Sequence, residues 1–136
     1  MSSLNSMLLP ENAIEVLQGE SKTLRLTVTQ PDPSGETSSI PLILENSTIY
    51  FTVKVHASDR EHIFQKTSAQ VTEIDITNPR AGVAEIYITP GDTISVDPDT
   101  NYVYDVWVLF TATGKRYPVV KPSIFRVVSG VTKLSI

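Results

Sequence analysis

Short segments in which apolar and polar residues alternate with a period of two recur along this chain, and they constrain its fold more than any other feature. The segments 24–28, 49–56 and 84–89 show the alternation most clearly, with β-branched and aromatic side chains prominent at the apolar positions. Successive side chains of a strand point to opposite faces, so the alternation predicts strands with one buried face. Clusters rich in Pro, Gly, Asn and Asp, such as 30–35 and 78–82, separate these segments. Such clusters are typical of turns.

The full set of predicted strands determines the fold class. The strands are expected at 13–18, 22–30, 47–56, 62–66, 71–77, 82–89, 102–111, 115–120 and 123–129, with a further short one at 131–136. A single helical turn is expected at 93–95, where Asp92 is placed to cap it. Roughly seven to nine short strands without intervening helices predict an all-β fold, an immunoglobulin-like antiparallel β-sandwich. The chain has no cysteine, so this sandwich has no disulfide.

The sequence predicts one folded domain with a short segment at each end. A chain of 136 residues is expected to form one domain around a single core. Residues 11–130 are predicted to form that β-sandwich domain, and residues 131–136 a C-terminal strand or tail. Residues 1–10 mix Ser and Asn with Leu and Met and show neither period. They are predicted to form an N-terminal arm that is mobile or bound to a partner.

Charge and the terminal sequence exclude several classes of partner. The net charge is −4, the isoelectric point is near 5.1, and no run of Lys or Arg is present. A nucleic-acid partner is therefore not expected. The N-terminus lacks a basic region followed by a long apolar run, so no signal peptide is predicted. No stretch approaches the ~20 apolar residues of a membrane helix, so no membrane partner is expected either.

Neither a catalytic centre nor a metal site is predicted. His56 and His62 flank Ser58 and Asp59, which nominally supply a Ser/His/Asp trio, but one exposed loop does not hold a base against a nucleophile as a triad requires. A polar turn is the favoured interpretation. Two histidines also lack the further ligands of a zinc site. The alternating oxygens of 97–101 resemble the start of a calcium loop, yet such a loop needs Gly at 102 and Glu at 108, where the chain has Tyr and Val. No cofactor is expected.

The segment 102–110 is apolar on both sides of the predicted strand. Its even positions carry Tyr, Val and Phe, and its odd positions carry Val103, Asp105, Trp107 and Leu109. One face is expected to fill the core and the other to meet a partner subunit or a folded-over segment such as 1–17, because a monomer rarely exposes a contiguous apolar row. The alternative is that the domain itself covers both faces. Trp107 is expected to be packed.

Asp105 needs a partner if this strand is buried, because an unpaired buried carboxylate costs several kcal/mol. A structural ion pair or hydrogen bond to a neighbouring strand, with Lys115, Arg116 or Arg126 as candidates, is the favoured interpretation. A pair between subunits is the alternative.

Several pieces of the chain, read in order, carry a resemblance to a known family. These pieces are QGESKTLRL at 18–26, STIYFTVK at 47–54, ITNPRAGVA at 76–84, ITPGDT at 88–93, YVYDV at 102–106 and FRV at 125–127. Together they resemble the N-terminal domain of phage baseplate upper proteins, over about residues 14 to 130. The resemblance implies an immunoglobulin-like β-sandwich that attaches one virion component to another without catalysis.

The function expected from this resemblance is that of a non-enzymatic phage virion structural protein. It would be a connector or adaptor subunit of the tail or baseplate, located in the virion and made in the host cytoplasm. Its partners would be other virion structural proteins and further copies of itself in a homo-oligomer. A capsid decoration or head-fibre-anchoring protein is one alternative. A carbohydrate-binding β-sandwich that uses Trp107 or a tyrosine as a stacking platform is an alternative of another class, which requires an open Trp107 in the free protein.

The residues expected at the interface come from the two ends of the chain and from the strand at 102–110. The terminal ones are apolar, and 131–136 alternates in a way suited to adding a strand to a sheet edge. The candidates are Leu4, Leu8, Leu9, Tyr102, Tyr104, Asp105, Trp107, Leu134 and Ile136.

Overall fold

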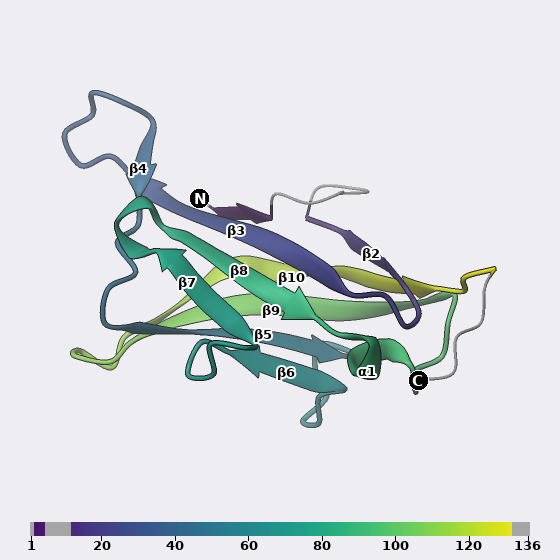
Figure 1. The fold of residues 1–136 in the computed structure, drawn as a ribbon. Coiled ribbons are helices and arrows are strands. Elements are labelled where there is room, and N and C mark those ends of the chain that lie inside the picture. The colour runs from purple at the N-terminus through teal and green to yellow at the C-terminus, as the bar shows by residue number, and fades with distance from the viewer. Residues whose placement is uncertain (1, 5–11, 132–136) are drawn as a thin grey trace.

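The computed structural model describes residues 2–4 and 12–131, which form two curled β-sheets around one core (Figure 1). The strands of the first sheet are β1 (Ser2–Leu4), β3 (Lys22–Pro31), β8 (Val83–Ile88) and β7 (Ile74–Asn78), in that spatial order, with β4 (Ser39–Pro41) also paired to β3. The strands of the second sheet are β2 (Ile14–Leu17), β10 (Arg116–Val128), β9 (Thr100–Phe110), β5 (Ser47–Lys54) and β6 (Phe64–Thr67). The all-β prediction is confirmed.

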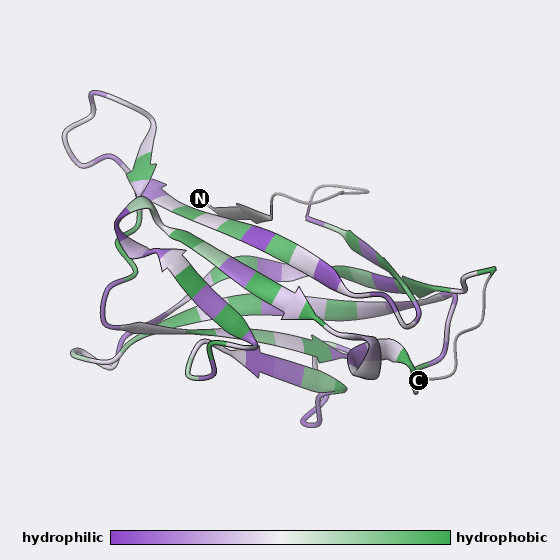
Figure 2. Cartoon of the chain, in the orientation of Figure 1, coloured by the Kyte–Doolittle hydropathy of each residue, from purple (hydrophilic) through white to green (hydrophobic). Residues whose placement is uncertain are grey.

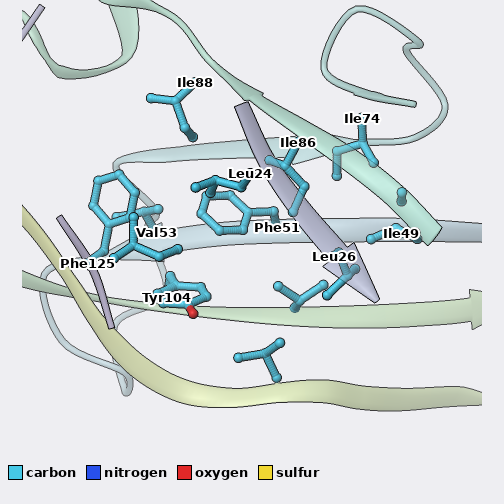
Figure 3. Close-up of a cluster of buried hydrophobic side chains, with 14 of the residues drawn as sticks. Leu24, Leu26, Ile49, Phe51, Val53, Ile74, Ile86, Ile88, Tyr104 and Phe125 are labelled. Carbon is cyan, nitrogen blue, oxygen red and sulfur yellow. The ribbon is translucent and has the colours of Figure 1, made fainter. Parts of the chain in front are cut away.

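The alternation in the sequence corresponds to the inward and outward faces of both sheets. Bands of opposite hydropathy follow one another along the strands, as Figure 2 shows. Along β3, for example, Leu24 and Leu26 are fully buried, whereas Arg25 between them is exposed. The inward residues of the two sheets meet in the core (Figure 3). Burying each of these side chains contributes about 1.5–3 kcal/mol to the stability of the folded state.

Aromatic rings fill one part of this core. Phe51 of β5 lies 5.2 Å from the ring of Tyr104 and 6.1 Å from that of Phe125, measured between ring centroids. Phe64 of β6 lies 5.8 Å from Phe125. The inclined and edge-on arrangements are those that aromatic quadrupoles favour. The strands of the second sheet are thereby connected by their side chains as well as by their backbone ladder.

The predicted segments 115–120 and 123–129 are in fact one strand, β10. Its register against β9 shifts between Pro118 and Val120 and again between Val120 and Ser123. Pro118 and Pro122 have no N–H to donate to the ladder, which is the reason that proline in a strand accompanies bulges. The gap between the two predicted strands therefore corresponds to a pair of irregularities within one strand.

The predicted helical turn lies a few residues earlier than expected. Helix α1 spans Pro90–Thr93, with Thr89 as its N-cap residue. Asp92 is inside the helix, and its Oδ2 accepts a hydrogen bond from the Thr89 backbone N–H at 2.7 Å. A short 3-10 turn, η1, spans Pro79–Ala81 and ends at Gly82 in a left-handed conformation.

The N-terminal segment reaches both sheets. Residues 2–4, expected in a mobile or partner-bound arm, form β1 and pair antiparallel with β3, with Leu4 opposite Leu26. β2 then pairs in parallel with β10. The strand expected at 131–136 lies outside the described residues except for Val131, and so do the interface candidates Leu8, Leu9, Leu134 and Ile136. β1 and β4, each of three residues, were not predicted because so short a segment shows no alternation.

Candidate binding face

The outward side of the second sheet, formed by β5, β6, β9 and β10, is called the outer face below. Strand pairing places its side chains in rows that cross the sheet. In one row Tyr50 lies opposite Trp107, and Trp107 lies opposite Pro118. Residues opposite one another on the same face have Cβ atoms about 4.5–5.5 Å apart. Two aromatic side chains and a proline ring thus lie side by side on the outer face.

Trp107 is exposed, contrary to the expectation that it would be packed. Its exposed fraction is 39%, and its indole Nε1 donates a hydrogen bond to Asp105 Oδ2 at 3.0 Å. Residues two apart in a strand share a face and are separated by about 7 Å. The indole therefore extends along β9 towards Asp105. This hydrogen bond restricts the rotation of a large aromatic side chain that the domain leaves open to solvent.

Asp105 therefore has a different partner from the one predicted. The carboxylate is half-buried and accepts the indole hydrogen bond. Among the described residues it forms no ion pair with Lys115, Arg116 or Arg126. Arg126 is instead close to Glu15, at 3.9 Å, and donates to Asn101 Oδ1 at 2.9 Å. Burial without a countercharge is avoided because Asp105 points outward.

A hollow of about 520 Å³ surrounds Trp107 on the outer face. One wall is the loop between β5 and β6, which contributes Arg60 and His62, and Arg116 of β10 lines it as well. The remaining lining residues are Tyr50, Thr52, Lys54, Ala57, Gln65, Val103, Tyr104, Asp105, Trp107, Val108, Leu109 and Pro122. The volume is in the range of small-molecule sites, about 300–1,000 Å³.

The charge around this hollow is opposite in sign to that of the whole chain. Three cationic residues line it, namely Lys54, Arg60 and Arg116, against one carboxylate, Asp105. Lys54 Nζ donates to the backbone carbonyl of Asp59 at 2.7 Å, which supports the loop. In the part of the chain that the structure describes, neither arginine forms an ion pair. A local positive field on an acidic protein attracts anions.

Tyr102 and Tyr104, both candidates for the interface, lie inside the domain. Their exposed fractions are 5% and 1%. The Tyr102 hydroxyl donates to the backbone carbonyl of Asp97 at 3.0 Å, and the Tyr104 hydroxyl donates to that of Asn12. Burial raises the pKa of Tyr104. The even-numbered face of β9 is therefore the core face, and the odd-numbered face is the outer one.

The candidate catalytic trio is spread along the loop between β5 and β6. Asp59 Oδ2 accepts from the backbone N–H of His56 at 3.0 Å, and Asp59 N–H donates to the carbonyl of His56 at 3.0 Å. In the described loop no hydrogen bond connects the side chains of Ser58, His56 and His62. Asp59 thus closes a turn, and it does not orient a histidine.

The segment 97–101 uses its oxygens for contacts within the domain. Asp99 accepts from the backbone N–H and the hydroxyl of Ser129, at 3.3 and 3.0 Å. Asn101 accepts from Arg126. No group of three or more His, Asp or Glu side chains able to hold a metal occurs among residues 12–131.

A second hollow, of about 1,110 Å³ and more apolar, is lined by residues of both sheets. Val28 and Leu42 line it from one side, and Phe110 and Tyr117 from the other. The two rings are in edge contact at 6.0 Å, and Tyr117 is 46% exposed. The sequence alone did not predict this hollow, because these four residues come from separate parts of the chain.

Two comparisons with known proteins give no match for this chain. A scan against protein-family models gives no match. A search among curated proteins gives none either. Within the described residues no helix is long and apolar enough to cross a membrane. The outer face and the arrangement of the strands are therefore the features that bear on function.

Proposed function

We propose that this chain is a non-enzymatic structural protein of a phage virion, an immunoglobulin-like β-sandwich that connects virion subunits through its outer face. The strand orders support the fold assignment. If β1, β3, β8 and β7 stand for strands A, B, E and D, they have the order of one immunoglobulin sheet, and β10, β9 and β5 then have the order G, F and C of the other. The family resemblance of the sequence supports the virion role, and a fold alone does not.

The observation that carries the binding role is the exposed, hydrogen-bonded Trp107 beside Tyr50 in a hollow of the outer face. Tryptophan, tyrosine and arginine are enriched among the residues that dominate binding energies. All three residue types occur here within one surface. A side chain already restricted by a hydrogen bond loses less conformational entropy on binding than a free one. These features favour an outer face that binds a partner.

The exposure of Trp107 also favours a second candidate function, carbohydrate binding. A stacking platform for a sugar has to be open in the free protein, and Trp107 is open. The polar residues Thr52 and Gln65, hydrogen-bonded to each other at 2.9 Å, lie beside the aromatic row. The two functions share one surface.

Complementation of a phage that lacks this gene tests the connector role. Trp107→Ala is expected to fold normally and to be lost from purified virions, as measured by quantitative mass spectrometry. Tyr87→Ala is the matched control, because Tyr87 is a half-buried outward aromatic on β8 of the other sheet. Wild-type protein that is absent from purified virions would contradict the virion role. Equal incorporation of both variants into virions would show that Trp107 does not take part in the contact between subunits.

A further inference from the structure

The hollow on the outer face combines three chemical features that few ligands match at once. It has an aromatic surface at Trp107 and Tyr50, a carboxylate at Asp105 and two guanidinium groups at Arg60 and Arg116. We propose that it binds an anionic saccharide, a sugar that carries a carboxylate, sulfate or phosphate group. This inference rests on the binding role proposed for the same face, and it names the class of ligand.

The aromatic row provides the platform for a sugar ring. One side of a pyranose ring presents C–H groups, which are apolar and pack against the face of an indole. Trp107 is held along β9 by Asp105, and Tyr50 extends the aromatic surface across to β5. The hollow, about 520 Å³, has room for one or two sugar rings. Stacking of this kind gives affinity without specifying the substituents.

Asp105 provides an acceptor for hydroxyl groups. Its Oδ2 accepts from the indole N–H, and among the described residues no hydrogen bond to its Oδ1 is formed. An ionised carboxylate only accepts hydrogen bonds, so its partner has to be a donor. Sugar hydroxyls are donors. The carboxylates of an acidic peptide would instead be repelled at this position.

Arg60 and Arg116 are the reason that we expect the ligand to carry a negative charge. Both are exposed, both line the hollow, and in the described chain neither has an ion-pair partner. Asp59 and Glu61 belong to the same loop as Arg60 but do not line the hollow. Guanidinium groups bind carboxylate, sulfate and phosphate through paired hydrogen bonds. An extended nucleic acid would instead encounter a chain with a net charge of −4.

A glycan array followed by titration calorimetry tests the proposal. The array carries carboxylated, sulfated and phosphorylated glycans, each beside its uncharged counterpart, together with polyuridylate and polyglutamate. At least one acidic glycan is expected to bind about 10-fold or more tightly than its neutral counterpart, because the neutral form lacks charge-assisted hydrogen bonds to the guanidinium groups. Which arm binds identifies the anionic group. Equal binding of the neutral forms, or preference for polyuridylate or polyglutamate, would overturn the proposal.

Point variants then assign the binding to this hollow. Arg116→Gln and Arg60→Gln are each expected to weaken binding about 10-fold, and Trp107→Ala to abolish it, whereas Trp107→Phe keeps part of it. Arg25→Gln makes the same change in charge on the exposed side of β3, in the other sheet, and is expected to have no effect. Unchanged affinity of Arg116→Gln would refute the site.

The two proposals fail in different ways. If no glycan binds but Trp107→Ala is lost from virions, the connector role stands and the saccharide site does not. If an acidic glycan binds and Trp107→Ala still incorporates, the saccharide site stands and the subunit contact lies elsewhere.

Discussion

At the scale of single residues, position 82 is the clearest case in which only glycine fits the backbone. It ends η1 with φ at +71°, and its carbonyl accepts from Val28 N–H at 2.8 Å. A Cβ atom at this position would lie 2.4 Å from the carbonyl oxygen of Val28 and 2.9 Å from that of Leu42. Both are backbone atoms, which cannot rotate away. The glycine therefore permits β3, η1 and the segment after β4 to meet.

Gly82→Ala is expected to destabilise the protein well beyond the cost of a left-handed residue. Gly114→Ala is the matched control, since Gly114 has φ at +73° and, apart from its two chain neighbours, no residue has an atom within 4 Å of the place that a Cβ would take. The control should cost about 1–2 kcal/mol for its backbone conformation, and Gly82→Ala a further 1–3 kcal/mol or so for the clash. Urea unfolding of both variants measures the difference. Equal losses would mean that the backbone around residue 82 yields without cost.

Asp32 provides a test by pH. Its carboxylate accepts hydrogen bonds from the hydroxyl and backbone N–H of Ser34, at 2.8 and 2.9 Å, and from the same groups of Thr37, at 2.9 and 3.0 Å. These bonds lower the pKa of Asp32 to about 2, from an ordinary value of about 3.9. Because the folded pKa lies below the unfolded one, the loop gains its full stabilisation above about pH 4 and loses it as the pH falls towards 2.

Carboxyl carbon NMR shifts recorded against pH measure this pKa directly. The Asp32 signal should titrate near pH 2 in the wild type and closer to about 4 in Ser34→Ala. A wild-type midpoint at the ordinary value of about 3.9 would show that these hydrogen bonds do not hold in solution.

At the scale of elements, α1 is fixed by side chains from outside it. Lys66 of β6 is 7% exposed and forms an ion pair with Asp92 at 2.7 Å. The Gln18 side chain donates to the carbonyls of Thr93, Ile94 and Val96, at 3.3, 3.3 and 2.8 Å. One side chain thus binds three carbonyls at the end of the helix and just beyond it, where backbone carbonyls lack helical partners. Contacts from distant parts of the chain, more than its own four residues, hold α1 in place.

Lys66→Met is expected to destabilise the fold by about 3 kcal/mol, because it leaves the largely buried Asp92 without its countercharge. In Lys66→Met/Asp92→Asn the uncompensated charge is removed as well, so the double variant should be less destabilised than the sum of the single ones. Thermal and urea unfolding of the wild type, the single variants Lys66→Met and Asp92→Asn, and the double variant measure the four stabilities of this double-mutant cycle. Strict additivity of the two changes would show that the pair does not interact.

The longer strands could be predicted from the sequence, whereas their lateral neighbours could not. The strands β3, β5, β8 and β9 were predicted because each has several inward positions, and burial of one face imposes the period of two. Most of the outer face was not predicted. Arg60 and Arg116 are far apart in the chain, and they line the same hollow as Trp107 only because a loop and an irregular strand bring them there. Alternation predicts which residues face outward, and it contains no information on which outward residues become neighbours.

For the same reason the role of Trp107 was the least predictable. An apolar residue on the outward side of an apolar strand has the same pattern whether a partner, a ligand or the domain itself covers it. Only the surroundings in three dimensions distinguish these cases, and here they leave the indole open.

At the scale of the whole molecule, the two sheets bury the core and leave one outer face with an aromatic row and local positive charge. A small ligand or a neighbouring subunit that binds there would cover the indole of Trp107. The surface is available in the isolated domain because Trp107 contacts solvent over 39% of its area. Both proposed functions depend on that availability.

The fluorescence of Trp107 in the free protein tests this central claim most directly, because Trp107 is the one tryptophan of the chain. Because Trp107 is exposed on the outer face, we expect its emission to be shifted towards that of a hydrated indole and to be substantially quenched by iodide. Binding of a ligand or subunit should protect it from iodide. Iodide, an anion, should quench more efficiently still because Arg60 and Arg116 attract it. Blue-shifted emission that iodide does not quench would contradict the claim, since it would place Trp107 inside the free protein.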